Sequence, residues 1–521
     1  MKRIPLFYFG FLILIFTAPI ASAQQIPYDP LVSKDYQPPV FIQDNRAEKI
    51  RELAPAIEQL IQKHARDKNI PGIAYGIVVD DNLVVSGSTG KTHLEQNIPV
   101  TTSSVFRIAS MTKSFTTMAI MKLQEEGKLS IKEPVRLYIP EMAYLKYPTT
   151  DSPLITVENL MTMSAGFPED NPWGDRQLDE TDQMLMDLVA DGISFSNPPS
   201  KEYEYSNTGY ALLGNIITRV SGMPYQQYIN EEILKPLGME DTYWEYADVP
   251  EEQLAIGYRW EDGNWKLEPM LHDGSFGAIG GLMTSIEDFA KYVSFHLSAL
   301  PARSEDEQGP VNRNTLREMH MPQFPRLYAN AKDYNQEPCP YMAGYGYGLG
   351  INEDCHGRKV VRHGGALPGF GSNYVFYPEY GVGLMAFGYL TYTAPWPLAE
   401  IEKLLFEEAG IEPRKLPVSD ILAERMQQVL ALIQHWEADL EDKILAENFY
   451  LDRSREHRMA DAQKIFEQAG PIEHISEITP QNQLRGNFII QAENGLINVF
   501  FSLNPENPPK VQALNLSFIP K

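Results

Sequence analysis

The chain has 521 residues, of which 43% are hydrophobic and 22% are charged, and its formal net charge is −25. This is the composition of an ordinary globular protein, with room for one large domain and a smaller one. A strongly acidic chain lacks the basic surface that nucleic-acid phosphates require, so we expect no nucleic-acid partner.

The N-terminus carries the pattern of an export signal. Lys2 and Arg3 precede an apolar run that ends at Ala21-Ser22-Ala23, a small-residue cleavage site. The run is too short for a membrane anchor, and no later stretch reaches about 18 apolar residues, so we expect no membrane span. We therefore expect a signal peptide at residues 1–23, cut after Ala23, and a secreted or periplasmic protein.

An irregular lead-in at residues 24–45, rich in Pro, Gln and Asp, precedes the main domain at 46–411. Early strands and a late strand cluster, with helices between them, predict an α/β (α+β) fold whose single sheet is built from both ends of the domain. In chain order we expect a helix at 46–67, hairpin strands at 73–79 and 83–86, a buried helix around 110–121, helices at 157–163, 182–190, 209–220, 225–233 and 286–297, strands at 344–351, 359–362, 372–377 and 382–389, and a helix at 398–409.

A short Pro-flanked linker at 412–418 leads to a small α+β module at 419–521. Its pattern predicts an amphipathic helix at 421–436 and strands at 496–503 and 511–519, joined by a turn-rich segment. No cluster of nucleophile, base and acid is visible in this module.

Ser110 and Lys113 are one helical turn apart within an apolar segment. Residues three apart on a helix share a face, and a buried lysine without a partner loses its proton more easily. A deprotonated amine beside a hydroxyl is a general base beside a nucleophile. The same spacing recurs at Ser88 and Lys91, but Gly90 favours a turn there.

Two further segments complete the candidate site. Tyr205-Ser206-Asn207 lies just before a helix and supplies a polar pair for proton transfer and substrate binding. His363-Gly364-Gly365-Ala366 follows a strand, and glycines at a strand edge let the backbone approach a ligand closely.

The two cysteines, Cys339 and Cys355, could close a disulfide in an oxidising compartment, and two free thiols are the alternative. Neither lies in a metal-ligand spacing, and the ten histidines show no HExxH pattern. We expect no catalytic metal and no cofactor.

The three motifs, in this order and roughly 95 and 160 residues apart, resemble those of the serine penicillin-recognising enzymes, which include the serine β-lactamases and penicillin-binding proteins. The chain is most similar to the class C β-lactamase-like branch, which also contains D-Ala carboxypeptidases, D-aminopeptidases and esterases. Segments 155–166 and 234–239 share the resemblance, which covers about residues 45–410. It implies a β-lactamase/transpeptidase-like fold, with an antiparallel sheet flanked by helices and a mostly helical subdomain. From about residue 418 the chain weakly resembles NTF2-like or cystatin-like accessory domains.

The resemblance also implies residue roles. Ser110 would attack a carbonyl carbon, and either Lys113 or Tyr205 would accept its proton, since the sequence leaves both open. Asn207 would bond the acyl side of the substrate, and backbone N–H groups of Ser110 and Ala366 would hold the oxyanion.

One position departs from the β-lactamase pattern. Many relatives have a lysine where His363 stands, and that cation meets the carboxylate of a penicillin or of a terminal D-alanine. A histidine is mostly neutral near pH 7, so a carboxylate-bearing substrate is less favoured. The histidine form resembles D-aminopeptidase-like and esterase-like members.

We therefore expect an exported serine hydrolase that cleaves an amide or ester bond through an acyl-enzyme on Ser110. Its substrate would be a small molecule or short peptide, either a D-amino-acid peptide or a small ester. One alternative is a β-lactamase. An alternative of another class is a penicillin-binding or sensing protein without turnover, or a partner-binding protein, with the C-terminal domain offering a surface for a partner or ligand.

Overall fold

The computed structural model describes residues 32–521, so the expected signal peptide at 1–23 lies outside the described residues. The chain separates into residues 1–36 and 37–521, and the following description concerns the second unit. Within the described part of the chain, no helix combines the length and apolarity needed to cross a membrane.

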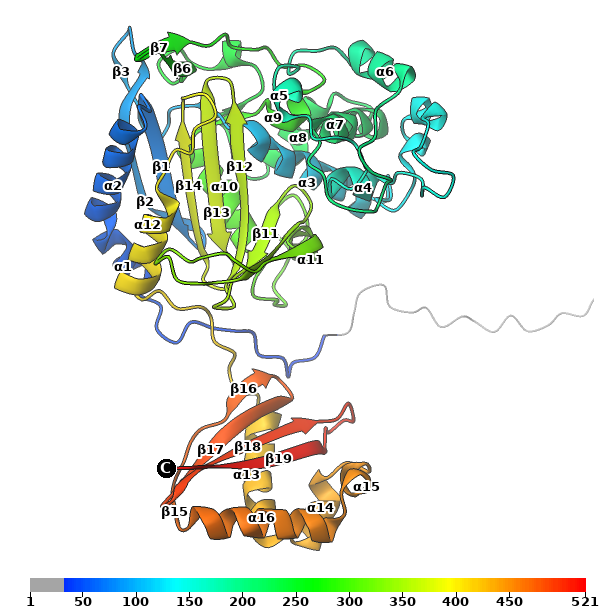
Figure 1. Cartoon of the computed structure of the whole chain (residues 1–521), viewed down its shortest axis with the longest axis vertical. Coiled ribbons are helices and arrows are strands. Elements are labelled where there is room, and N and C mark those ends of the chain that lie inside the picture. Colours follow the sequence, from blue (N-terminus) through cyan, green and yellow to red (C-terminus); the bar gives the residue numbers. More distant parts are fainter. Residues whose placement is uncertain (1–31) are drawn as a thin grey trace, which may run out of the picture. The chain divides into compact units, whose positions relative to one another are not determined.

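The main sheet has nine strands, and every neighbouring pair is antiparallel. Its order is β3 (Ile98–Pro99), β2 (Asn82–His93), β1 (Gly72–Val79), β14 (Val382–Gly388), β13 (Phe370–Tyr377), β12 (Lys359–Leu367), β11 (Gly350–Glu353), β10 (Tyr341–Tyr345) and β9 (Gln323–Tyr328). Strand β1 lies beside β14, with Ile73 opposite Gly388, so the sheet joins the two ends of the domain as the sequence predicts (Figure 1).

Helices cover both faces of this sheet. Alternate residues of a strand point to opposite faces, and in β1 the residues on both faces are buried. Ile73, Ile77 and their neighbours at alternate positions pack against α1 (Arg46–Glu52), α2 (Ala54–Asp67) and α12 (Leu398–Lys403). Ala74 and Val78 pack in the larger core with α3 (Thr112–Glu125) and α10 (Ile286–Leu297). The fold is therefore the predicted antiparallel sheet flanked by helices.

A mostly helical region adjoins the sheet on the side of α3, as Figure 1 shows. The other elements between β3 and β9 along the chain are η1 (Ala109–Met111), η2 (Val135–Leu137), η3 (Pro140–Tyr144), α4 (Val157–Met161), α5 (Asn171–Gly174), α6 (Asp182–Asp191), α7 (Asn207–Ser221), α8 (Tyr225–Ile229), η4 (Asn230–Leu234), η5 (Tyr246–Asp248), α9 (Gly277–Gly280), α11 (Arg313–Met319), the sheet β4 (Phe106–Arg107), β8 (Met283–Thr284) and β5 (Thr242–Tyr243), and the hairpin β6 (Tyr258–Glu261) with β7 (Asn264–Leu267). Of these, α4 to α9 belong to the helical region (Figure 1). A π-helical segment, η6 (Leu404–Glu408), extends α12.

The structure differs from the predicted elements at several places, including the following three. The expected helix at 46–67 is two helices that meet at Leu53, because Pro55 fits the first turn of a helix and not its interior. The expected strand at 344–351 is the hairpin of β10 and β11. The second Ser-x-x-Lys copy, at 88–91, lies in strand β2 and not in a turn, although Gly90 has a φ of 85°.

Residues 420–520 form a sheet and core of their own. The elements are α13 (Asp420–His435), α14 (Ala438–Ile444), α15 (Phe449–Asp452) and α16 (Arg455–Ala469), followed by β15 (Ile472–Ile475), β16 (Thr479–Asn482), β17 (Arg485–Ala492), β18 (Gly495–Leu503) and β19 (Val511–Pro520). Alternate residues of β17 and β18 pack in one cluster with α13, such as Phe488 and Val499 against Val429. Helices precede strands here, as the α+β pattern predicts, and the domain boundaries at 411 and 419 stay a prediction.

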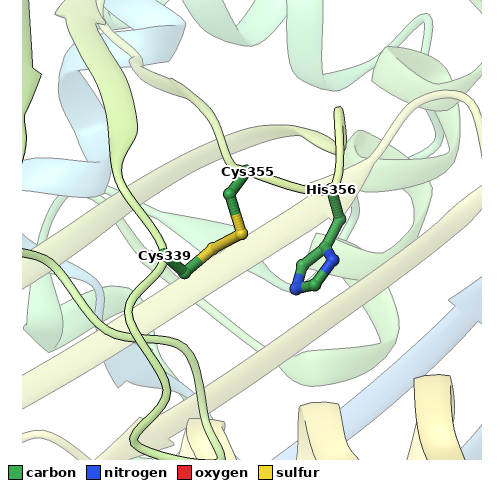
Figure 2. A group of neighbouring side chains, drawn as sticks. All are labelled: Cys339, Cys355 and His356. Carbon is green, nitrogen blue, oxygen red and sulfur yellow. A yellow bond between two sulfur atoms is a disulfide. The ribbon is translucent and has the colours of Figure 1, made fainter.

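Cys339 and Cys355 form a disulfide, with Cα atoms 5.2 Å apart (Figure 2). The sequence left this pairing open. The bond links the segment before β10 to the segment after β11, and its two cysteines are 16 positions apart. It therefore closes a short loop at the end of the hairpin.

Removing this cross-link should lower the free energy of unfolding. Closure of a loop of about 15 residues is worth about 3 kcal/mol through the lost entropy of the unfolded chain. The double variant Cys339→Ala/Cys355→Ala should lose about that much in urea denaturation, and a dithiol reductant should destabilise only the wild type. Equal denaturation midpoints for oxidised and reduced wild type would contradict a stabilising disulfide.

Candidate active site

Ser110 lies where the chain enters the buried helix α3. The preceding Ala109 has a φ of 52°, in the left-handed region that costs a non-glycine residue about 1–3 kcal/mol. Its η1 turn then runs directly into α3, and the Thr112 hydroxyl accepts a hydrogen bond from the backbone N–H of Leu282. The surrounding structure thus fixes an unfavourable backbone angle immediately before Ser110, which is 9% exposed and lines a cavity.

Lys113 is completely buried, and its Nζ lies 3.0 Å from the Ser110 Oγ. The same Nζ donates a hydrogen bond to the carbonyl oxygen of Ile279, at 2.9 Å, in the short helix α9. Burial lowers the pKa of Lys113 from 10.5 to about 7, while the negative charges of Asp175 and Asp170 oppose this change. A large fraction of the amine is therefore unprotonated at neutral pH, as the sequence predicts for a lysine in an apolar helix.

Tyr205 lies near this pair, just before α7. The hydroxyl of Ser206 accepts from the N–H of Gly209 and begins the helix, so Tyr205 occupies the connection that leads into it. The Lys113 Nζ is 5.0 Å from the centre of the Tyr205 ring. Burial raises the pKa of Tyr205 well above its ordinary value, with the Ser110 hydroxyl opposing, so the phenol stays protonated at neutral pH.

Asn207 is the first residue of α7 and is completely buried, but it does not line the cavity. Its Nδ2 donates to the Oδ1 of Asn171 at 3.0 Å, and Asn171 is the residue that reaches the cavity. The Oδ1 of Asn207 accepts no hydrogen bond from any described residue. The geometry therefore places Asn171 between Asn207 and a ligand in the cavity.

The segment His363–Ala366 lies inside strand β12, and all four residues line the cavity. The sequence pattern predicts it after a strand that ends at Arg362, so the strand is longer than predicted. Strand β11 pairs with β12 only as far as Arg362, whereas β13 continues to Leu367. Beyond Arg362 one edge of β12 has no partner strand among the described residues, so its backbone groups on that edge are available to a ligand.

Gly365 is the point where β12 comes closest to the turn that carries Ser110. A Cβ at Gly365 would lie 2.1 Å from the carbonyl oxygen of Ile108 and 2.3 Å from the Oγ of Ser372. These two atoms are hydrogen-bonded to each other at 2.7 Å. The glycine therefore allows a contact between backbone and backbone that any side chain would prevent.

His363 uses both ring nitrogens within the protein. Its Nδ1 lies 2.6 Å from the carbonyl oxygen of Gly364, which can only accept, so Nδ1 carries the proton and Nε2 accepts from the Tyr345 hydroxyl at 3.0 Å. Burial, with the nearby charge of Lys113, lowers the pKa of His363 to about 3. The ring is a neutral part of the cavity wall.

The cavity has a volume of about 570 Å³, and several of its lining residues were missed by the sequence analysis. These include Asn171 and Asp175 around α5, Asn373 of β13, and Tyr392 in the loop after β14. Burial raises the pKa of Asp175 from 3.8 to about 7, against the opposing charge of Lys113. A lone aspartate in a polar loop carries no sequence signal, because its burial results from the packing of distant segments.

Cys339, Cys355 and His356 are the only described group of three potential metal ligands whose ligand atoms lie within 4.8 Å of one another (Figure 2). The two sulfurs are bonded to each other, so neither is the thiolate that a metal would require. This group also contains no residue that lines the cavity at Ser110.

Residues 57–400 match the family model described as Beta-lactamase. Among curated proteins, the chain is 29% identical to Beta-lactamase-like protein 2 of Dictyostelium discoideum over 275 residues, which is 51% of this chain and 50% of that protein. It is 26% identical to Protein flp of Staphylococcus aureus strain MW2 over 334 residues, 63% of this chain and 61% of that protein. The chain thus spans between half and two thirds of the length of these relatives.

Two solved structures have a similar fold. The octameric penicillin-binding protein homologue from Pyrococcus abyssi superposes with a TM-score of 0.54 at 22% identity, covering 90% of this chain and 96% of that one. A class C beta-lactamase superposes with a TM-score of 0.55 at 19% identity, covering 70% of this chain and 98% of that one.

The close approach at Gly365 leads us to expect that a side chain at this position destabilises the protein. Gly365→Ala should lower the free energy of unfolding by about 1–3 kcal/mol, because β12 must move away from two fixed atoms. The matched control is Gly364→Ala, whose Cβ would lie 2.9 Å from the Oδ1 of Asn373, the end of a side chain that can rotate. Urea denaturation measures both variants, and equal destabilisation would contradict the assigned role of Gly365.

Proposed function

The chain belongs to the Beta-lactamase family, and from this premise we propose that it is a serine hydrolase that cleaves an amide or ester bond through an acyl-enzyme on Ser110. The family's fold is consistent with serine hydrolase activity. The observation that carries the proposal is the buried Lys113 amine at 3.0 Å from the Ser110 hydroxyl.

In the first step, the Ser110 Oγ bonds to the carbonyl carbon of the substrate, and its proton passes to a base. Of the two candidates that the sequence left open, Lys113 fits this role better, since its pKa of about 7 makes it partly neutral whereas Tyr205 stays protonated. General-base assistance of this kind contributes about 10²–10⁴-fold.

Tyr205 fits the complementary role of an acid. Its protonated hydroxyl would donate to the leaving amine or alcohol as the bond to the carbonyl carbon breaks, and Lys113, whose Nζ is 5.0 Å from the ring centre, would then return its proton to the phenol. Water repeats the attack on the acyl-enzyme and releases the acid product with Ser110 regenerated.

The negative charge that develops on the carbonyl oxygen needs hydrogen-bond donors. The backbone N–H of Ser110, in the η1 turn before α3, and that of Ala366, on the stretch of β12 that β11 leaves unpaired, are the donors that we assign to it. Each such donor typically contributes about 3–4 kcal/mol to the stability of the transition state.

The cavity favours a peptidase or esterase over a β-lactamase. No described residue lining it is a lysine or arginine, and His363 is neutral with both nitrogens in use. A penicillin carboxylate would therefore lack a cationic partner. The small ester and the D-amino-acid peptide both remain substrates within this proposal, and Asn207 would act on them only through Asn171.

Export is part of the proposal, with secretion or the periplasm as the destination. It is supported by the signal-peptide pattern at residues 1–23 and by the disulfide, which persists in oxidising compartments.

Ser110 should react with a fluorophosphonate. Intact-protein mass spectrometry should show one adduct on the wild type and none on Ser110→Ala, because an activated hydroxyl is required for displacement of fluoride. Turnover of p-nitrophenyl esters should follow the same pattern, and a chromogenic cephalosporin tests the β-lactamase alternative. Absence of an adduct on both proteins would reject the hydrolase and favour the binding or sensing protein.

The labelling rate should rise with pH through about 7 and then level off, because Lys113 acts as a base only after it loses its proton. Asp175→Asn should move this rise to lower pH, since the carboxylate charge favours the ammonium form of Lys113. His363→Gln should keep the rise, because the imidazole titrates near pH 3. A rate that is flat between pH 5 and 9 would contradict Lys113 as the base.

A further inference from the structure

Asp175 is an acidic residue inside the cavity that neither gives nor takes a proton in the proposed reaction. It caps the short helix α5, is 4% exposed, and lines the same cavity as Ser110. A carboxylate can accept about four hydrogen bonds. The hydroxyl of Tyr392 is a neighbouring side-chain donor, and no ion pair within 4 Å among the described residues involves Asp175.

The positive charge of Lys113 acts on Asp175 and lowers the pKa of its carboxyl, but the two groups form no ion pair within 4 Å. Of the neighbouring acids, Asp170 accepts from the N–H groups of Asn207 and Thr208, at 2.6 and 2.8 Å, and so belongs to the beginning of α7. Arg107 lines a second, small cavity together with Asp175, but the charges that act on Arg107 are led by Asp273 and Glu245.

Burial of a carboxylate without an ion-pair partner costs free energy, and a bound cation offsets that cost. Asp175 is the one ionisable carboxyl among the residues described as lining the cavity, and the wall holds no lysine or arginine. A primary ammonium group has three donors, and Asn373 and Thr393, whose side chains carry acceptor oxygens, line the same cavity.

We propose that Asp175 binds a protonated amine of the substrate, so that the enzyme prefers amides or esters with a primary ammonium group close to the scissile carbonyl. This inference rests on the proposed function at Ser110. In this role Asp175 selects the substrate, and its negative charge disfavours substrates that carry a carboxylate at the same position.

A rival role for Asp175 is electrostatic support of Lys113, whose ammonium form its charge favours. The two roles differ in a measurable way. Support of Lys113 affects every substrate alike, whereas binding of an amine affects only substrates that carry one.

The preference for an ammonium group can be tested with two phosphonates that react covalently with Ser110 and differ in one group. Diphenyl aminomethylphosphonate carries an ammonium where diphenyl ethylphosphonate carries a methyl group of similar size. In both, the Ser110 Oγ bonds to phosphorus, phenoxide leaves, and the serine proton passes to the base. Intact-protein mass spectrometry gives the second-order rate constant for each, and their ratio measures the preference for the ammonium.

In Asp175→Asn the ratio should fall about tenfold or more relative to wild type, as expected for loss of a charge-assisted hydrogen bond. The neutral probe corrects for any change in Lys113, and comparison of the two proteins cancels the intrinsic reactivity of each probe. Asp179→Asn is the matched control, because it removes the same charge from an exposed position four residues away and should keep the wild-type ratio.

An unchanged ratio in Asp175→Asn would overturn the amine site, and equal slowing of both probes is one form of that result. No reaction with either probe would overturn it as well. Labelling of wild type and Asp175→Asn by the fluorophosphonate shows that both proteins are folded and that Ser110 is reactive. Failure of that labelling in the wild type would instead reject the proposed function itself.

Discussion

The site depends on the removal of one lysine amine from water. Lys113 has no ion-pair partner within 4 Å among the described residues, and it is held by the Ser110 hydroxyl and the Ile279 carbonyl. Both partners are neutral, so burial is not offset by a salt bridge and the proton is held weakly. The helix that carries Lys113 can be buried on all sides only because the sheet covers one side and the helical region covers the other.

The surrounding structure is arranged to hold this geometry. Helix α3 is anchored by hydroxyl groups, with Ser114 accepting from Tyr292 and Thr116 donating to the carbonyl of Ala278. Strand β12 is held against the Ser110 turn at Gly365, through the hydrogen bond between Ser372 and the Ile108 carbonyl. The nucleophile, the amine and the open strand edge therefore lie on elements that pack directly on one another, which limits their relative motion.

The sequence was sufficient for the parts of the site that follow from local spacing. The contact between Ser110 and Lys113 follows from helical periodicity, and the pairing of β1 with β14 follows from the positions of apolar segments at both ends of the domain. The position of Asn207 behind Asn171 and the burial of Asp175 were not predictable, since a polar loop around α5 covers α7 for reasons that involve distant packing. Pro55 indicates the break between the two helices at Leu53. The apolar periodicity nevertheless predicted one continuous helix, because it runs through both.

The pairing of β1 with β14 has a consequence for how the protein is made. These strands come from residues 72–79 and 382–388, so more than 300 residues separate the two halves of the central strand pair. Domains emerge from the ribosome or a membrane pore N-terminus first, and contacts of long sequence separation form late. A chain that has extended only past α3 exposes an apolar helix without its sheet. The buried environment of Lys113 beside Ser110 is therefore complete only when nearly the whole domain is present, and under the proposed reaction a shorter fragment would carry Ser110 as an ordinary hydroxyl.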